Sequence, residues 1–142
     1  MKKLYFALVA LLLCAISASA ANIPAGTSLY LTPNSNWKES NARFAAYFFG
    51  NSGNAWASMT KVAGETDLYE VTTPTGTWTN VIFCRMNPSA TANNWNNKWN
   101  QTSDLTYDGT NNHYTVKADT WDNWIGEPAL RPQWPLDPFP VC

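Results

Sequence analysis

The feature that most constrains the fold is an alternation of side chains with period two. It recurs along the chain with turn residues between the runs, and no stretch sustains a helical period. Leu29 and Leu31, for example, point to one side of an extended run while Tyr30 points to the other. The pattern predicts an all-β domain of roughly six to eight strands, a number that suits a β-sandwich.

One predicted strand, at 44–49, is apolar or aromatic on both faces. Phe44 and Phe48 point to one face, and Tyr47 and Phe49 point to the other. A strand of this kind either lies centrally in a sandwich or presents an aromatic strip to a ligand. Both interpretations remain open from the sequence.

Turn residues separate the strands. The segments 50–53 and 64–67 are predicted as turns, and Asp108-Gly109 is a signal for a further hairpin. After that hairpin, alternation predicts that Tyr114 faces inward and that His113 faces water.

The stretch 81–105 combines a strand-like apolar run with an asparagine-rich loop. The loop carries Trp95 and Trp99, and it closes on Gln101 before another strand. Such a loop can bury its tryptophans on a sheet or leave them as a contact surface. Aromatic rings beside uncharged amides suit neutral polar ligands, because amides both donate and accept hydrogen bonds.

The N-terminal segment has the pattern of a secretory signal. Lys2 and Lys3 precede an apolar run, and small residues end at Ala20, so residues 1–20 are predicted to be removed. About 120 residues would remain, enough for one domain with its own core. We therefore expect a secreted protein, extracellular or periplasmic, with no membrane span in the mature form.

Charge argues against two kinds of partner. The chain has nine Lys and Arg against ten Asp and Glu. Nucleic-acid binding needs a basic face, so no nucleic-acid partner is expected, and adhesion to anionic membranes has no support either.

Two cysteines remain after the predicted signal, Cys84 and Cys142. In an exported protein they can form one disulfide that ties the C-terminus to a strand. The alternative is a buried Cys84 and a free terminal thiol. With one histidine and no closely spaced cysteine pair, no zinc site is expected.

The last segment, 119–142, differs from the rest of the chain in its prolines and tryptophans. Repeated proline excludes a helix or a central strand and predicts an extended tail. We expect a β-sandwich domain at 21–118 and a tail that packs across it and covers an open edge or face.

An ordered set of short segments carries a family resemblance, over about residues 28 to 107. The segments are Ala46-Tyr47-Phe48-Phe49, Trp56, Met59-Thr60-Lys61-Val62, Leu68-Tyr69-Glu70-Val71-Thr72-Thr73-Pro74, Val81-Ile82-Phe83 and Asn100-Gln101-Thr102-Ser103-Asp104-Leu105. Their order resembles the starch-binding carbohydrate-binding modules of families 25 and 26. The resemblance implies an immunoglobulin-like β-sandwich that binds α-glucan without cleaving it.

The resemblance also implies ligand-binding positions. Tyr47 with Phe49 matches the family's aromatic pair, Trp56 matches its loop tryptophan, and Gln101 matches the glutamine of its closing motif. The connection after Cys84 is longer than the family's short turn. Its residues Trp95, Lys98 and Trp99 have no family counterpart, and we add them as candidate ligand-binding residues.

Catalysis has little support in the sequence. His113 has no nucleophile partner nearby in the chain, and the aspartates between Asp104 and Asp122 are more often turn formers than a glycosidase pair. No enzyme activity, metal or other cofactor is predicted.

The sequence therefore predicts a secreted, non-catalytic carbohydrate-binding protein for starch-like α-glucan. One alternative is a secreted protein-interaction module or small inhibitor that uses the Trp95–Trp99 loop and the C-terminal tail. A third interpretation is structural, with the tryptophans serving only as core.

Overall fold

The computed structural model describes residues 21–51 and 53–122. The predicted signal at 1–20 and the tail beyond Asp122, including Cys142, lie outside the described residues. The elements in chain order are β1 (Ser28–Thr32), α1 (Ser35–Lys38), the 3-10 helix η1 (Glu39–Asn41), β2 (Arg43–Gly50), β3 (Gly53–Ser58), β4 (Thr60–Lys61), β5 (Tyr69–Thr72), β6 (Asn80–Met86), the 3-10 helix η2 (Trp95–Asn97), β7 (Lys98–Gln101), β8 (Leu105–Thr106) and β9 (His113–Thr115).

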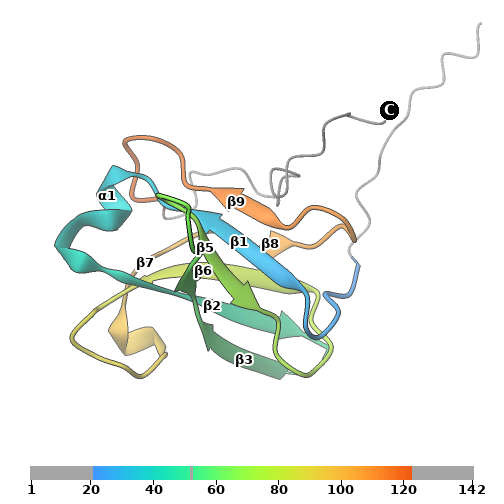
Figure 1. Ribbon diagram of the computed structural model, residues 1–142. Helices are drawn as coiled ribbons and strands as arrows, with labels where there is room; N and C mark the ends of the chain where they lie inside the picture. The colour runs from blue at the N-terminus through green and yellow to red at the C-terminus, as the bar shows by residue number, and fades with distance from the viewer. Residues whose placement is uncertain (1–20, 52, 123–142) are drawn as a thin grey trace, which may run out of the picture.

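The strands form two sheets, as the alternation predicted for an all-β chain. The first sheet has the order β4-β5-β1-β9, and the second has the order β3-β2-β6-β7 with β8 paired to β6. The pairs are antiparallel except for β1 with β9, which run parallel. Figure 1 shows the two layers, with β1 and β9 above β2 and β3.

The hydrophobic core lies between the sheets. Leu29 and Leu31 of β1 contribute from the first sheet, and Phe48 and Phe83 contribute from the second. Each lies on the inward side of its strand because side chains of one strand alternate between faces. The core also includes Trp37 of α1, which is fully buried.

A second apolar cluster lies on the opposite face of the second sheet, which we call the outer face. Its buried members are Ala45 of β2 and Ile82, Cys84 and Met86 of β6. They alternate with the core residues along the same two strands. The strand predicted to be apolar on both faces therefore lies between β3 and β6 in its sheet, and its outer face carries the buried Ala45 beside the half-buried Tyr47 and Phe49.

Two predicted turns are confirmed. Gly50 pairs with Gly53 across the β2–β3 hairpin, and Val62 N donates to Leu68 O at 2.8 Å across the β4–β5 connection. Gly50 has φ of 129°, and a Cβ there would lie 2.9 Å from Thr79 N, so the tight hairpin requires glycine.

The hairpin predicted at Asp108-Gly109 is wrong. Strand β8 before it pairs with β6, and β9 after it pairs with β1, so the segment crosses from one sheet to the other. The turn chemistry is nevertheless present, because Asp108 Oδ1 accepts from Thr110 N at 2.9 Å and from Asn111 N at 2.7 Å. Burial acts to raise the pKa of Asp108, but these hydrogen bonds outweigh it and lower that pKa.

The prediction that His113 faces water is also wrong. Its side chain is only 6% exposed, although its strand neighbour Tyr114 is buried as expected. On its face of the sheet His113 lies against Thr32 of β1, whose Oγ1 is 2.7 Å from His113 Nε2.

The described end of the chain, 119–122, is bonded to α1 and β9. Asn34 Nδ2 donates to Thr120 O at 2.7 Å, Trp37 Nε1 donates to Trp121 O at 2.9 Å, and Tyr114 OH donates to Asp122 Oδ2 at 2.5 Å. These bonds attach the start of the predicted tail to the domain. Within 21–51 and 53–122, no helix has the length and apolar composition needed to cross a bilayer.

Candidate functional site

Four aromatic rings gather on the outer face of the second sheet. We call Tyr47, Phe49, Trp56 and Trp95 the aromatic cluster. The ring centroid of Tyr47 lies 5.7 Å from Phe49, 5.0 Å from Trp56 and 4.6 Å from Trp95, and Trp56 lies 4.7 Å from Trp95. Tyr47, Phe49 and Trp56 are half-buried, and Trp95 is 42% exposed, so the cluster presents ring surface to solvent.

Strand alternation and hairpin register bring three of these rings together. Tyr47 and Phe49 are two residues apart on β2, so they share a face. Trp56 of β3 is the direct cross-strand partner of Tyr47. Directly opposed side chains in an antiparallel pair lie on the same face, and the sequence prediction of a Tyr47–Phe49–Trp56 group therefore has a geometric basis.

The rings are not coplanar. The planes of Tyr47 and Phe49 differ by 28°, whereas Trp56 and Trp95 are inclined to Tyr47 by 57° and 60°. The two tryptophans are thus inclined to Tyr47 more steeply than Phe49 is. A curved partner can contact such a surface on more than one side.

Lys98 and Gln101 of β7 lie beside the cluster. Lys98 pairs with Met86 and Gln101 pairs with Cys84, both of which face outward, and Lys98 Nζ donates to Gln101 Oε1. Lys98 Nζ also lies 5.3 Å from the ring centroid of Trp95. The structure thus brings together six of the seven residues predicted from the sequence.

Trp99, the seventh, lies apart from this group. The Arg85 guanidinium carbon lies 4.7 Å from the Trp99 ring and 5.1 Å from the Trp121 ring. Arg85 itself is buried and donates to Trp37 O at 2.9 Å and to Glu39 O at 2.7 Å. Arg85 pairs with Asn100 and Met86 pairs with Lys98, so the register shift between them leaves Trp99 without a cross-strand partner. Trp99 therefore contacts Arg85, whereas Trp95 contacts the aromatic cluster.

Amide side chains border the aromatic cluster. Asn54 of β3 and Asn80 of β6 are the two cross-strand partners of Phe49, so they share its face. Asn80 Nδ2 donates to Thr106 Oγ1 at 3.3 Å, and Asn93 Nδ2 donates to Ser58 Oγ at 3.0 Å. These groups offer donors and acceptors next to apolar ring surface.

Sequence reasoning missed Arg43, the first residue of β2. Its side chain donates to three backbone carbonyls and one side-chain amide of the 87–93 loop, which leads to Trp95. The available signal was an arginine at the start of an apolar strand. Its contacts depend on residues more than forty positions away.

Cys84 lies under the cluster as a buried, free thiol. The predicted Cys84–Cys142 disulfide is not seen, and Cys142 lies outside the described residues. Burial raises the pKa of Cys84 to about 12, with the nearby Lys98 charge acting in the opposite direction. The thiol is therefore a small apolar group of the sheet and not a nucleophile.

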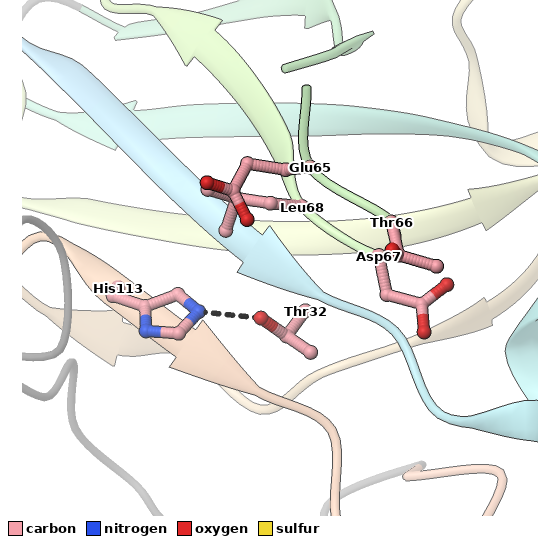
Figure 2. A pocket seen from close by; sticks show the side chains of 6 residues that line it. All are labelled: Thr32, Glu65, Thr66, Asp67, Leu68 and His113. Atoms are coloured by element: carbon pink, nitrogen blue, oxygen red, sulfur yellow. Dashed lines mark hydrogen bonds between the residues drawn. The ribbon is translucent and has the colours of Figure 1, made fainter. Parts of the chain in front are cut away.

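Two hollows lie at the other sheet, away from the aromatic cluster. One has a volume of about 260 Å³ and is lined by Thr32, His113 and residues 65–68, as Figure 2 shows. The other, of about 320 Å³, is lined by Asp67 and Lys38, which form an ion pair at 2.9 Å, and by residues 33–35 and 115–119 except Lys117.

The first hollow contains a hydroxyl and an imidazole in contact. Thr32 Oγ1 lies 2.7 Å from His113 Nε2. A nucleophile–base pair also needs a group that orients the imidazole, but His113 Nδ1 is bonded to no described residue. Burial lowers the pKa of His113, which favours the neutral ring. The Thr32–His113 contact is best explained as a structural bond between β1 and β9.

Metal coordination finds no donor set in the described residues. No three side chains among their His, Cys, Asp and Glu come together in a group that could hold an ion.

Comparison with known proteins found no matching family model, no matching curated protein and no matching solved structure.

Proposed function

We propose that this protein binds glycan chains, without cleaving them, on the outer face of the β3-β2-β6-β7 sheet. The observation that supports this most directly is the aromatic cluster, in which three rings lie within 6 Å of the Tyr47 ring and all four keep part of their surface in solvent. Exposed apolar surface of this kind marks interaction sites in soluble proteins.

The chemistry of a sugar fits the chemistry of this face. A pyranose ring presents C–H groups that stack on an aromatic ring, and its hydroxyls need donors and acceptors in the plane of the sugar. Asn54, Asn80 and Gln101 supply amides beside the rings. Each stacked ring contributes on the order of 1–2 kcal/mol, and two or three rings would give micromolar to millimolar binding.

The inclination of the rings supports a curved chain as the ligand. A flat crystalline glucan surface requires coplanar rings, but Trp56 and Trp95 are inclined by 57° and 60° to Tyr47. An α-linked glucan curves along its length, so one chain can contact Tyr47, Phe49 and the inclined tryptophans together. Starch-like α-glucan is therefore the proposed ligand class, in keeping with the resemblance to starch-binding modules.

The remaining expectations belong to the same proposal. The two-sheet architecture is proposed to be an immunoglobulin-like sandwich, as in those modules. The protein is proposed to act outside the cytoplasm after removal of residues 1–20, as a binding protein that needs no cofactor.

Affinity electrophoresis in gels that contain soluble starch or glycogen tests the proposal. The protein is expected to be retarded in α-glucan gels and to show little retardation with soluble cellulose derivatives, which present a straighter chain. Tyr47→Ala and Trp56→Ala should each reduce the retardation, because each removes a stacked ring. Lys61→Ala, an exposed change on β4 of the other sheet, is the matched control and should leave it unchanged. Equal mobility with and without every glucan would reject the proposal.

A second candidate is a protein-interaction surface around Trp99 and Trp121. These two tryptophans are 41% and 40% exposed and flank the Arg85 guanidinium. Tryptophan and arginine are enriched at the centres of protein interfaces. Loss of partner capture in a folded Trp99→Ala variant, with Trp95→Ala unaffected, would favour this candidate over glycan binding.

A further inference from the structure

The side chain of Arg43 makes an unusual set of contacts at the edge of the outer face. Its Nε donates to Asn87 O at 3.2 Å and to Ala90 O at 2.7 Å. Its Nη2 donates to Ala92 O at 2.8 Å, and its Nη1 donates to Asn93 Oδ1 at 2.5 Å. All four acceptors belong to the single loop between β6 and η2.

This loop has few other attachments to the sheet. Asn93 Nδ2 donates to Ser58 Oγ on β3, and Asn87 N, at the start of the loop, donates to Asn97 O of η2 at 2.8 Å. Residues 88, 89, 91 and 92 are exposed, so the middle of the loop buries little apolar surface. Its position is therefore set mainly by hydrogen bonds, and Arg43 supplies most of those that reach β2.

Trp95 depends on the position of this loop. Trp95 is the first residue of η2, and the N-cap Asn94 Oδ1 accepts from Asn97 N at 2.9 Å. Asn97 Nδ2 in turn donates to Ala92 O at 2.9 Å. Ala92 O also accepts from Arg43, so one carbonyl links the arginine to the turn that carries Trp95. The Trp95 ring contacts both Tyr47 and Trp56, although 42% of the residue remains exposed.

We propose that Arg43 is a positioning residue that fixes the 87–97 loop so that Trp95 is preset as one wall of the glycan site. The inference rests on the proposed function, because it assigns Trp95 a share of ligand contact. A ring held in place before the ligand arrives costs less entropy on binding than a ring that must be ordered. Arg43 therefore acts on affinity through Trp95, without touching the sugar.

A guanidinium is needed for this role. Its planar fork presents five donors in fixed directions, whereas a lysine ammonium is a point charge on a flexible stem. Arg43→Lys keeps the charge but cannot reach four acceptors in these directions. It is expected to behave like Arg43→Ala, which would separate geometry from charge.

The first test reads the position of Trp95 without any ligand. Trp56 and Trp95 lie 4.7 Å apart, close enough for their indole transitions to couple in circular dichroism. The coupled signal is expected to disappear in Arg43→Ala and in Trp95→Ala, and acrylamide should quench tryptophan fluorescence more strongly in Arg43→Ala. Lys117→Ala, an exposed change after β9, is the control. A signal that survives in Arg43→Ala would overturn the inference.

The second test measures affinity for maltoheptaose, a short α-glucan, by titration calorimetry. Arg43→Ala and Trp95→Ala are each expected to weaken binding about tenfold, equivalent to one wall of the site. The double variant should be no weaker than Trp95→Ala, because both changes remove the same contact. Additive losses would show that Arg43 acts elsewhere and would overturn the inference.

Two further outcomes separate this inference from the proposed function. If the unaltered protein binds no glucan but the indole coupling depends on Arg43, the proposed function fails and the positioning of Trp95 stands. If glucan binds equally well to the unaltered protein and to a folded Arg43→Ala variant, the positioning role fails and the proposed function stands. Should Arg43→Ala not fold, Asn93→Ala removes its bond to Arg43 together with its bond to Ser58, and Ser58→Ala, which removes only the second bond, is the control for the same measurements.

Discussion

The two faces of β2 and β6 carry side chains of similar apolar character but meet different surroundings. On the inner face, Phe48 and Phe83 are fully buried against the first sheet. On the outer face, Tyr47 and Phe49 are only half-buried, and Trp95 from the neighbouring loop packs against Tyr47. A sheet covers its neighbour evenly, whereas a loop covers one end and leaves ring surface beside it. The inner face is therefore closed between the two sheets, whereas the outer face leaves aromatic ring surface in solvent, where we propose that glycan binds.

The largest expected effect is on the labelling rate of Cys84, which is buried on the outer face. Cys84 lies under the rings, and burial raises its pKa to about 12 from an ordinary value of 9.0. At pH 8 its reaction with a thiolate-selective reagent should be roughly a thousandfold slower than that of an ordinary thiol, because the three-unit shift removes the thiolate.

Mass spectrometry of labelled peptides can follow Cys84 separately from the other cysteines. Labelling should become fast once urea unfolds the chain. Fast labelling of the native protein would contradict a closed outer layer. A linked Cys84–Cys142 peptide under non-reducing conditions would restore the disulfide predicted from the sequence.

Adjacent residues on β2 give the next effect in size. Phe48→Ala should lower the free energy of unfolding by about 3–5 kcal/mol, because it opens a cavity in the core between the sheets. Phe49→Ala should lower it by about 1–2 kcal/mol, since its ring is only half-buried. Urea unfolding followed by far-ultraviolet circular dichroism measures both. Equal losses would remove the distinction between the two faces.

Trp95 and Trp99 are expected to differ in their contribution to α-glucan affinity. They are 42% and 41% exposed, but Trp95 contacts the aromatic cluster and Trp99 contacts Arg85. Trp95→Ala should weaken α-glucan binding about tenfold, whereas Trp99→Ala should change it by less than about twofold. Calorimetric titration of the two folded variants decides this. A larger loss in Trp99→Ala would move the binding surface to the Arg85 side of the molecule.

The smallest expected effect is the pH dependence of stability that is due to His113, which lies in the first sheet. Its pKa is lowered by burial, so the unfolded chain binds the proton more readily than the folded protein. The contribution of neutral His113 to the free energy of unfolding should therefore be complete above about pH 6.5. It should decrease as the pH falls from there toward the lower pKa of the folded state. Glu65 and Asp67 are the acidic residues that line the same hollow as His113.

Thermal unfolding between pH 8 and pH 5 measures this dependence. In His113→Gln, which keeps a polar group near Thr32 Oγ1, the part due to His113 should disappear. An unchanged pH profile in that variant would show that other groups, such as the carboxylates of the hollow, dominate.

Much of the fold could be predicted because it depends on neighbours in the chain. Alternation along 44–49 placed Phe48 and Tyr47 on opposite faces correctly, without showing which face is inward, and Gly50 marked its hairpin correctly. The grouping of Tyr47, Phe49 and Trp56 followed from spacing on β2 and from the resemblance to starch-binding modules. The role of that group in glycan binding stays a prediction.

Other features could not be predicted because they depend on distant residues. Asp108-Gly109 has the chemistry of a tight turn, but whether the strands beside it pair with each other is decided by β1 and β6. The burial of His113 depends on the same pairing of β9 with β1. A local pattern carries no information about which sheet a short strand joins.

The sequence by itself determined which segments are extended and which side chains share a face, because a strand's alternation follows from local backbone geometry. Tertiary structure alone decided that Arg43 holds the 87–93 loop, that Trp95 joins Tyr47 and Trp56, and that Trp99 lies with Arg85. These contacts form when the sheets pack and when a register shift turns one side chain away from its neighbour. Their partners are far apart in the chain, so only the packed sheets bring them together.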